Sequence, residues 1–557
     1  MSNPRIILLA LIITSLFILP AAAEIPSSYD ARLQNLTPPI TDQGNYGLCW
    51  AFSAISSLES SMIYQDPEKY AGIDLSPYHL AYFTYNRDDV IDPDSPIPGL
   101  EGIAGDYTYS NETEPVNNIS GLILGGYDYQ AVYTLAAGFG AVNESAAPFE
   151  PYGNNTRLSP DTAISGNEVM LKSATFIPAS DTDSIKSMLL ESGAGILQLF
   201  FAVEEPYLHE LDNGDWAFFL GTTDRENLSY SGMHAVLLIG WDDDFSKGYF
   251  NMTPEHDGAW LIQNSWGSNL SNCTYIWISY EETIDPVPFF TGDEPKYDHI
   301  YQYDGGTLRG GYPVNQTSVL IGNVFTAARD ELIRAVSLDT NQSVNYTLEI
   351  YTNLMSESPD SGTLFASETG AVQYPGYYTI ELTDYVPIEE GQSFSVVYSL
   401  DSDEQLNISI DESDIIEEDI ETVTFALPGQ SFVSNGTAWE DLSADGETNL
   451  RIKAFTTDTT FAIFIDPVTA SIKKRGITIS GTTTFAPGSE LNMTLICPDG
   501  SVLYETTEVM PDGWEVTVPN LKMFEEEYTV YVERKSVSAE TVFTPAGFKD
   551  MLIAFRA

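Results

Sequence analysis

The chain has 557 residues, which is too long for one ordinary core, so we expect two to four domains. It contains 81 acidic and 23 basic residues, for a formal net charge of −58, which disfavours binding to nucleic-acid phosphates or anionic membranes. A hydrophobic share of 43% is enough for packed cores and argues against disorder of the whole chain. The charge fits an exported protein in a salty medium, and equally an acidic secreted protein in an ordinary one.

The first 23 residues have the pattern of a secretory signal peptide. Arg5 precedes an apolar run from Ile6 to Leu19, and three alanines at 21–23 supply the small residues of a cleavage site. The run is short for a bilayer span, so we expect an exported mature protein without a stable membrane anchor; a retained anchor is the alternative. About fifteen Asn-x-Ser/Thr triplets fit an extracellular or cell-surface glycoprotein.

Only three cysteines occur, at positions 49, 273 and 497, so a disulfide framework does not hold this exported chain together. Whether Cys273 and Cys497 form a bridge stays open. Residues 41–62 predict a loop that enters a helix at Cys49. The positive end of a helix dipole favours a thiolate, and a thiolate nucleophile also needs a nearby cation, usually a histidine. An isolated cysteine is more often a buried, inert core residue, so the choice of Cys49 as the candidate nucleophile depends on the residues that flank it.

The next segments predict a mixed α and β domain. Residues 88–118 are acidic and rich in Pro, Gly and Ser, which indicates a surface insertion. A Gly125-Gly126 pair precedes a short predicted helix at 130–139. Two compact apolar segments, 234–241 and 259–266, predict buried strands.

The pattern of residues changes after residue 288. From about 300 to 457, short runs rich in Val, Tyr, Thr and Phe are broken by Gly, Asn and Asp, which predicts a β-sandwich. The acidic stretch 411–422 is expected to be a solvated loop. A similar pattern from about 459 to 557 predicts a smaller, Ig-like sandwich.

Residues 43–53, Gln-Gly-Asn-Tyr-Gly-Leu-Cys-Trp-Ala-Phe-Ser, resemble the active-site signature of papain-like cysteine peptidases. The resemblance implies that Cys49 is the nucleophile. It also implies that the side-chain amide of Gln43, together with the backbone N–H of Cys49, donates to the oxyanion that develops during attack.

Three further segments agree with this resemblance and follow in the family's order. The strand that begins near His234 is similar to the family's Asn-His-Ala-Val strand, which implies a general base. Residues 260–267, Trp-Leu-Ile-Gln-Asn-Ser-Trp-Gly, imply that Asn264 orients the imidazole and that Trp266 covers their hydrogen bond. The Gly125-Gly126 pair would bind the backbone of an extended substrate. By contrast, His79 is expected to be structural.

The sequence also departs from the family. Tyr46 stands where the family has the first signature cysteine, and Ile123 stands at the position of that cysteine's partner. Because both halves are replaced together, we expect an apolar contact in place of the bridge. Residues 25–30 resemble a mature N-terminus, which leaves no room for a long propeptide after the signal peptide and leaves open how activity is restrained.

Segments 301–305, 429–434 and 450–455 resemble, more loosely, the lectin-like domain that accompanies such peptidases in secreted bacterial and archaeal proteins. We therefore expect a multidomain chain, with an α+β papain-like peptidase domain followed by two β-sandwich domains. The expected boundaries are a signal peptide at 1–23, the peptidase domain at 24–288, a lectin-like domain at 289–457 and an Ig-like domain at 458–557.

The expected function is a secreted cysteine endopeptidase that acts on proteins or peptides through a Cys-His-Asn acyl-enzyme mechanism. The resemblance implies no metal and no organic cofactor, and it leaves carbohydrate binding by the lectin-like domain open. One alternative is a catalytically inactive surface or adhesion protein that binds through its β-domains. Another is a transpeptidase or transglutaminase with the same acyl chemistry.

Overall fold

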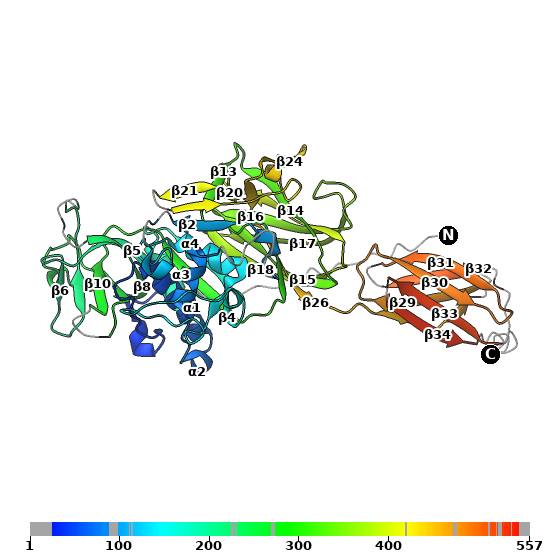
Figure 1. The fold of residues 1–557 in the computed structure, drawn as a ribbon, viewed down its shortest axis with the longest axis horizontal. Helices are drawn as coiled ribbons and strands as arrows, with labels where there is room; N and C mark the ends of the chain where they lie inside the picture. The colour runs from blue at the N-terminus through cyan, green and yellow to red at the C-terminus, as the bar shows by residue number, and fades with distance from the viewer. Residues whose placement is uncertain are drawn as a thin grey trace, which may run out of the picture.

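The computed structural model describes residues 25–544, apart from 88–97, 111, 113–114, 224, 226–227, 229–230, 269–272, 418–419, 472–475, 511–512, 520, 522–525 and 536. Three parts follow one another: an N-terminal part with the helices, a larger β-rich part beside it and a small β-rich part at the far end (Figure 1). The expected signal peptide at 1–23 lies outside the described residues. Within the described residues, no helix has the length and apolar character needed to cross a bilayer.

The N-terminal part has the predicted mixed α and β structure. Its helices are α1 (Cys49–Gln65), α2 (Pro67–Tyr70), α3 (Pro77–Tyr85), α4 (Asp128–Thr134) and α5 (Thr182–Ser192). Its main sheet has the order β1-β8-β9-β10-β7-β6, with β5 also paired to β8. These strands are β1 (Ser28–Asp30), β5 (Gly195–Ala202), β6 (Leu208–Glu210), β7 (Trp216–Phe218), β8 (Ser231–Asp242), β9 (Ala259–Gln263) and β10 (Tyr275–Ser279).

Helix α1 is the central element of this part. Every residue from Trp50 to Ile63 is buried, so the helix is covered on all sides. Its buried serines are tolerated because their hydroxyls are hydrogen-bonded: Ser57 Oγ donates to the Ala194 carbonyl at 2.7 Å, and Ser61 Oγ donates to the Leu58 carbonyl at 2.8 Å. This packing fixes the start of α1, and therefore Cys49, against the sheet.

The N-terminal part and the larger β-rich part share one ten-stranded sheet. Strand β4 of the N-terminal part pairs with β11 on one side and with β18 on the other, and the sheet continues through β15, β20 and β13. Its strands are β3 (Ala141–Val142), β4 (Asn167–Ile177), β11 (Val287–Asp293), β12 (His299–Tyr301), β13 (Gly310–Pro313), β15 (Glu331–Thr340), β18 (Gly376–Ile388), β20 (Asn407–Glu412), β25 (Thr448–Leu450) and β26 (Ala454–Asp458).

Two acidic segments are more structured than the surface insertion and the solvated loop that were expected. The described second half of the expected insertion at 88–118 contains β2 (Tyr107–Ser110), which pairs with β22 (Ile420–Val423) of the β-rich part. The stretch 411–422, expected as a solvated loop, forms the end of β20, β21 (Asp414–Glu417) and most of β22. These acidic segments are therefore structural parts of the junction between the two parts.

Ion pairs explain how acidic residues are accommodated at this junction. Arg451 Nη2 lies 3.0 Å from Asp411 Oδ1, and Lys453 Nζ lies 2.7 Å from Asp304 Oδ2, with all four side chains at most 2% exposed. The Arg451 guanidinium also lies 3.6 Å from the ring centroid of Tyr133, which belongs to α4. A buried charge is tolerated when it is paired and hydrogen-bonded, as here.

The β-rich part is completed by a six-stranded sheet of order β17-β16-β19-β14-β23-β24, which packs against the shared sheet. Its strands are β14 (Ser318–Thr326), β16 (Val344–Thr352), β17 (Thr363–Val372), β19 (Ser393–Asp401), β23 (Ser431–Ser434) and β24 (Trp439–Asp441).

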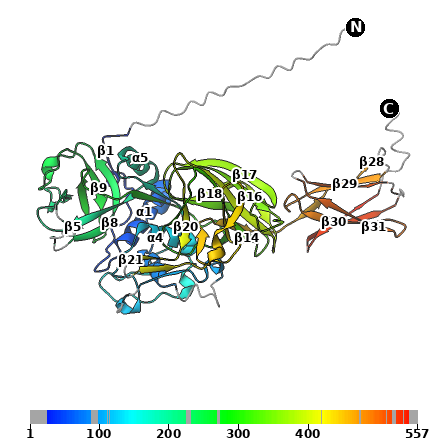
Figure 2. The same cartoon turned by 90° about the horizontal axis from the view of Figure 1, so that it is seen from above.

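The last part has its own core between two four-stranded sheets and is set apart from the rest in both views (Figures 1 and 2). Its strands are β27 (Ile463–Ile465), β28 (Thr469–Ser471), β29 (Gly476–Thr483), β30 (Glu490–Ile496), β31 (Val502–Glu508), β32 (Trp514–Pro519), β33 (Tyr528–Arg534) and β34 (Val537–Phe543).

Candidate active site

Cys49 and His234 meet where the start of α1 faces strand β8. Burial alone would raise the pKa of the Cys49 thiol, but a hydrogen bond to His234, the charge of its ring and the backbone N–H groups of Ala235 and Trp50 bring the pKa below its ordinary value. Burial disfavours the charged form of His234, yet the contact with Cys49 and the hydrogen bond to Asn264 raise the pKa of the imidazole. Each group thus stabilises the charged form of the other.

Asn264 holds the far side of the imidazole. His234 Nε2 lies 2.9 Å from Asn264 Oδ1, and Asn264 is 1% exposed. The same oxygen accepts the backbone N–H of Ser265 at 2.9 Å, which fixes the orientation of the amide. With Nε2 bonded to Asn264, the other ring nitrogen, Nδ1, is the one that is left for the thiol.

Two aromatic rings pack against the imidazole of His234. The Trp266 ring stacks on His234, with 5.0 Å between the ring centroids and 26° between the planes. The ring centroid of Phe201, on the neighbouring strand β5, lies 5.6 Å from that of His234 and 5.8 Å from that of Trp266. Covering a hydrogen bond with apolar groups keeps water from competing for it. The sequence analysis did not identify Phe201, because an apolar residue in a strand carries no signal beyond burial.

Gln43 is tied to the same loop as Asn264. Its side chain is buried, its Nε2 donates to the Tyr46 carbonyl at 2.9 Å and its Oε1 accepts from Ser265 Oγ at 2.7 Å. Its backbone N–H donates to the Ser265 carbonyl at 2.8 Å. The amide nitrogen carries two hydrogens, so one is available beyond the Tyr46 contact. Ser265 was not singled out from sequence, although it lies between the two predicted residues Asn264 and Trp266.

The Gly125-Gly126 pair lies beside the Cys49 loop. Gly125 has φ +90°, and a side chain built there would meet nothing within 4 Å, whereas one at Gly126 would lie 2.5 Å from the Trp50 ring. A Cβ at Gly47 would lie 3.0 Å from the Gly125 nitrogen, so the two loops are in close approach. The Gly125 backbone therefore borders open space next to the start of α1.

The replacement of the expected bridge differs in detail from the prediction. The Tyr46 ring packs against Phe149, at 5.4 Å between centroids, and its hydroxyl donates to the Gly153 carbonyl at 2.9 Å. Ile123 is 52% exposed, and the two loops are instead joined by the Gly47 N–H, which donates to the Leu122 carbonyl at 2.9 Å. The apolar contact exists, but Phe149 provides it.

The remaining cysteines and His79 have structural surroundings. All three cysteines are free thiols, so Cys273 and Cys497 form no bridge, and both are buried. Burial, with the nearby charge of Glu210, raises the pKa of Cys273 to about 12, which makes this thiol unreactive at neutral pH. His79 bonds to the Thr162 carbonyl at 2.7 Å, and burial lowers its pKa to about 4, so its ring is neutral.

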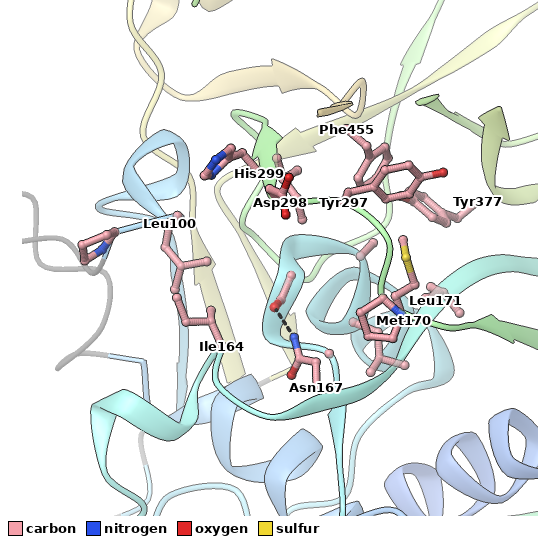
Figure 3. Close-up of a pocket in the computed structure, with 18 of the residues that line it drawn as sticks. Leu100, Ile164, Asn167, Met170, Leu171, Tyr297, Asp298, His299, Tyr377 and Phe455 are labelled. Atoms are coloured by element: carbon pink, nitrogen blue, oxygen red, sulfur yellow. Dashed lines mark hydrogen bonds between the residues drawn. The ribbon is translucent and has the colours of Figure 1, made fainter. Parts of the chain in front are cut away.

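Away from these residues, a cavity of about 350 Å³ lies between the N-terminal and β-rich parts (Figure 3). His299 lines this cavity, and its ring belongs to a cluster in which ligand atoms of His299, Glu331 and Asp458 lie within 4.8 Å of one another. The guanidinium of Arg329 is already in this cluster, 2.6 Å from the His299 ring and 3.8 Å from Glu331 Oε1. Since a cation already faces these carboxylates, we assign no metal to them.

Comparison with known families agrees with this arrangement. Residues 25–81 and 122–285 match the family "Papain family cysteine protease", and residues 300–456 match the family "Lectin like domain". The chain therefore carries a papain-family cysteine protease domain followed by a lectin-like domain.

Curated relatives match the papain-family part. A cathepsin L-like peptidase of Aedes aegypti is 24% identical over 260 residues, which are 47% of this chain and 60% of the relative. The probable cysteine protease RD19C of Arabidopsis thaliana is 26% identical over 252 residues, 45% of this chain and 55% of the relative. Mouse procathepsin L is 24% identical over 264 residues, 47% of this chain and 63% of the relative. The chain thus spans less than two thirds of each of these relatives.

Two solved structures share the arrangement of both domains. The clostridial cysteine protease Cwp84 after propeptide cleavage superposes with a TM-score of 0.60 at 23% identity, over 78% of this chain and 100% of that one. The cysteine protease and lectin-like domains of Cwp84, a surface layer associated protein of Clostridium difficile, superpose with a TM-score of 0.58 at 23% identity, over 78% and 89% of the two chains. At this identity the likeness establishes a common fold.

Proposed function

We propose that this papain-family protein is an exported cysteine endopeptidase that hydrolyses peptide bonds through an acyl-enzyme on Cys49. The observation that carries the proposal is the direct contact between the Cys49 thiol and the His234 imidazole, in which the pKa of the thiol falls and that of the imidazole rises. This pair favours the thiolate over the thiol, and the thiolate is the reactive form.

The proposed reaction has two stages. The Cys49 thiolate attacks the peptide carbonyl carbon, and the developing oxyanion accepts hydrogen bonds from the Gln43 side chain and the backbone N–H of Cys49. His234 protonates the leaving amine, and the acyl group stays on sulfur. His234 then takes a proton from water as the water attacks the thioester, which releases the acid product and restores the thiolate beside a protonated imidazole.

The neighbouring residues have supporting roles in this proposal. Asn264 orients the ring of His234, and the 2.9 Å distance between Asn264 Oδ1 and His234 Nε2 supports this role. Trp266 shields this hydrogen bond, and the stacking of its ring on the imidazole supports that role. Gly125 and Gly126 bind the backbone of an extended protein or peptide substrate, since the Gly125 backbone borders open space beside Cys49.

The organisation and setting are proposals as well. We propose a signal peptide at 1–23, a peptidase domain at 24–288, a lectin-like domain at 289–457 and an Ig-like domain at 458–557. We also propose secretion or attachment at the cell surface, in line with the description of Cwp84 as surface layer associated. Protein or peptide substrates are the proposed partners of the cleft, and carbohydrate is the proposed ligand class of the lectin-like domain.

The test is digestion of a peptide library by the wild-type chain and by Cys49→Ala in parallel. We expect internal cleavage by the wild type and none by the variant. A thiol-directed epoxide should label one site per chain, at Cys49, and His234→Ala should abolish the labelling. A properly folded wild type that neither cleaves nor is labelled would instead be an inactive binding protein. Transfer of the acyl group to an added amine, without hydrolysis, would identify a transpeptidase.

A further inference from the structure

The lectin-like domain has a small cavity at the open edge of its sandwich. Strand β13 is the last strand of the shared sheet, and β24 is the last strand of the six-stranded sheet. A cavity of about 280 Å³ lies between these two edges, which are near one another in Figure 1. Small-molecule sites have volumes of about 300–1,000 Å³, so this cavity has the size for one small unit of a ligand.

The floor of the cavity belongs to the core of the sandwich. Val319 and Val433 are buried, at 4% and 7% exposed, and Tyr312 and Val314 pack against the same core. These residues come from β14, β23 and the end of β13, so both sheets support the floor. A site on packed strands keeps its shape without a ligand.

The walls carry hydrogen-bonding groups that the chain itself does not use. The side chains of Tyr312, Trp439, Gln316 and Glu440 form no hydrogen bond within the part of the chain that the structure describes, although all four line the cavity. Asn435 uses its Oδ1 for the Thr437 backbone and hydroxyl, which leaves its NH₂ group available. Together they supply amide, phenol and indole donors and carbonyl and carboxylate acceptors.

This combination matches the chemistry of a sugar ring. Each hydroxyl of a sugar both donates and accepts, so a binding site needs both kinds of group within a few ångströms. The apolar C–H face of a sugar also packs on flat aromatic rings, which Trp439 and Tyr312 provide; tyrosine and tryptophan suit a site that is apolar on one side and wet on the other.

The charge of the cavity indicates whether neutral or anionic sugars can bind there. Its lining contains the carboxylate Glu440 and no Lys, Arg or His, in a chain with a net charge of −58. An anionic ligand would meet repulsion without a compensating cation. We propose that this cavity binds one unit of a neutral carbohydrate, with Trp439 and Tyr312 as the stacking surfaces. The inference deepens the proposed carbohydrate role of the lectin-like domain and is independent of the peptidase chemistry.

The test uses the full chain with Cys49→Ala, to avoid self-digestion. Because residues 435–437 form an Asn-Gly-Thr triplet, the protein is produced in a host that does not N-glycosylate. The probes are immobilised neutral oligosaccharides of glucose, mannose, galactose and N-acetylglucosamine, with glucuronate and sialic acid oligosaccharides for comparison. We expect retention on at least one neutral probe and none on the acidic probes.

Substitutions then locate the binding. Trp439→Ala should weaken the Kd for the retained neutral probe at least tenfold, and Trp439→Phe, which keeps a ring, should weaken it less. The matched control is Tyr385→Ala, which removes a 46% exposed ring of β18 that does not line the cavity, and it should leave the Kd unchanged. Unfolding midpoints of all variants verify the fold.

The possible failures are distinguishable. Neutral-sugar binding that survives in a folded Trp439→Ala, Gln316→Ala double variant would overturn this site and leave the carbohydrate role intact. A wild type that retains no neutral probe would overturn both, and the peptide-library result would stand apart from either. A preference for the acidic probes would overturn the argument from charge.

Discussion

The proposed reaction depends on single atoms, and Gln43 is the residue that tests the oxyanion contact. Gln43→Ala removes one side-chain donor while the backbone N–H of Cys49 stays. We expect kcat to fall by about 10²–10³-fold, the cost of losing one such donor, with little change in KM. Steady-state kinetics on a cleavable peptide measure this. An equal rise in KM with kcat unchanged would mean that Gln43 binds the ground state instead.

Asn264→Ala tests the orientation of the imidazole. The change removes Asn264 Oδ1, which lies 2.9 Å from His234 Nε2. In the wild type this hydrogen bond helps to raise the pKa of the imidazole. A hydrogen bond to a charged group contributes about 1.5–3 kcal/mol, so we expect kcat/KM to fall by about 10–100-fold. The alkaline limit of the activity should also move to lower pH, because the imidazolium loses a stabilising partner. An unchanged alkaline limit would contradict this role.

The Cys49–His234 contact makes a pH prediction that needs no substrate. Since His234 lowers the pKa of the thiol, alkylation of Cys49 by iodoacetamide should be appreciable below the ordinary thiol range. In His234→Ala the alkylation rate should rise only at higher pH. Burial still raises the pKa of the Cys49 thiol in this variant, but the imidazole that lowers it is gone. Mass spectrometry after timed alkylation separates Cys49 from the buried Cys273 and Cys497. Identical pH profiles in the two proteins would remove the basis of the proposed ion pair.

At the level of elements, helix α1 carries a buried carboxyl whose effect on stability can be measured. Glu59 is 2% exposed; burial raises its pKa well above the ordinary value, although its Oε1 accepts the Leu75 backbone N–H at 2.7 Å. The protonated form is therefore the one that suits the fold. The contribution of protonated Glu59 to the free energy of unfolding is complete below the pKa of a glutamate in the unfolded chain. It is lost as the pH rises through the higher pKa of Glu59 in the folded protein.

Glu59→Gln should remove this loss. We expect the difference in Tm between the variant and the wild type to be small at pH 4 and to grow in favour of the variant towards pH 8. Thermal unfolding of the Cys49→Ala background, with and without Glu59→Gln, measures the difference. A variant less stable at pH 8 than at pH 4, relative to the wild type, would show that the carboxylate is bound in its charged form.

The elements around the proposed site were predictable from sequence, and those at the domain junction were not. The helix that begins at Cys49 and the strands that contain His234 and lead to Asn264 follow from local apolar patterns and specific motifs. The pairing of β2 with β22 joins segments about 300 residues apart and leaves no local pattern. The segment that begins at Asp411 has the composition of a solvated loop. The burial of Asp411 is explained by its ion pair with Arg451, which comes much later in the sequence.

On the scale of the whole molecule, the junction between the protease and lectin-like parts resembles a domain core. Arg451→Ala would leave Asp411 without its buried partner, while Asp304 would keep Lys453; removing one partner of a buried ion pair typically costs about 3–5 kcal/mol. We expect both parts to lose stability together in calorimetry. The matched control is Lys69→Ala, which breaks an ion pair with Glu294 in which both side chains are more than 50% exposed, and it should cost far less stability. Separate transitions, with only one part affected, would contradict a common core.

The proposed endopeptidase has to survive in the presence of its own copies. A segment is vulnerable when it can leave its surroundings and lie extended in another molecule's groove, which exposed loop tips do readily. The protease and lectin-like parts are joined by the strand pairs β4–β18 and β2–β22, which would hold them together even after a cut in the chain between them. The passage from β26 to β27, at 459–462, lies outside any strand. Self-digestion would therefore release the last part and leave the protease and the lectin-like part as one durable unit.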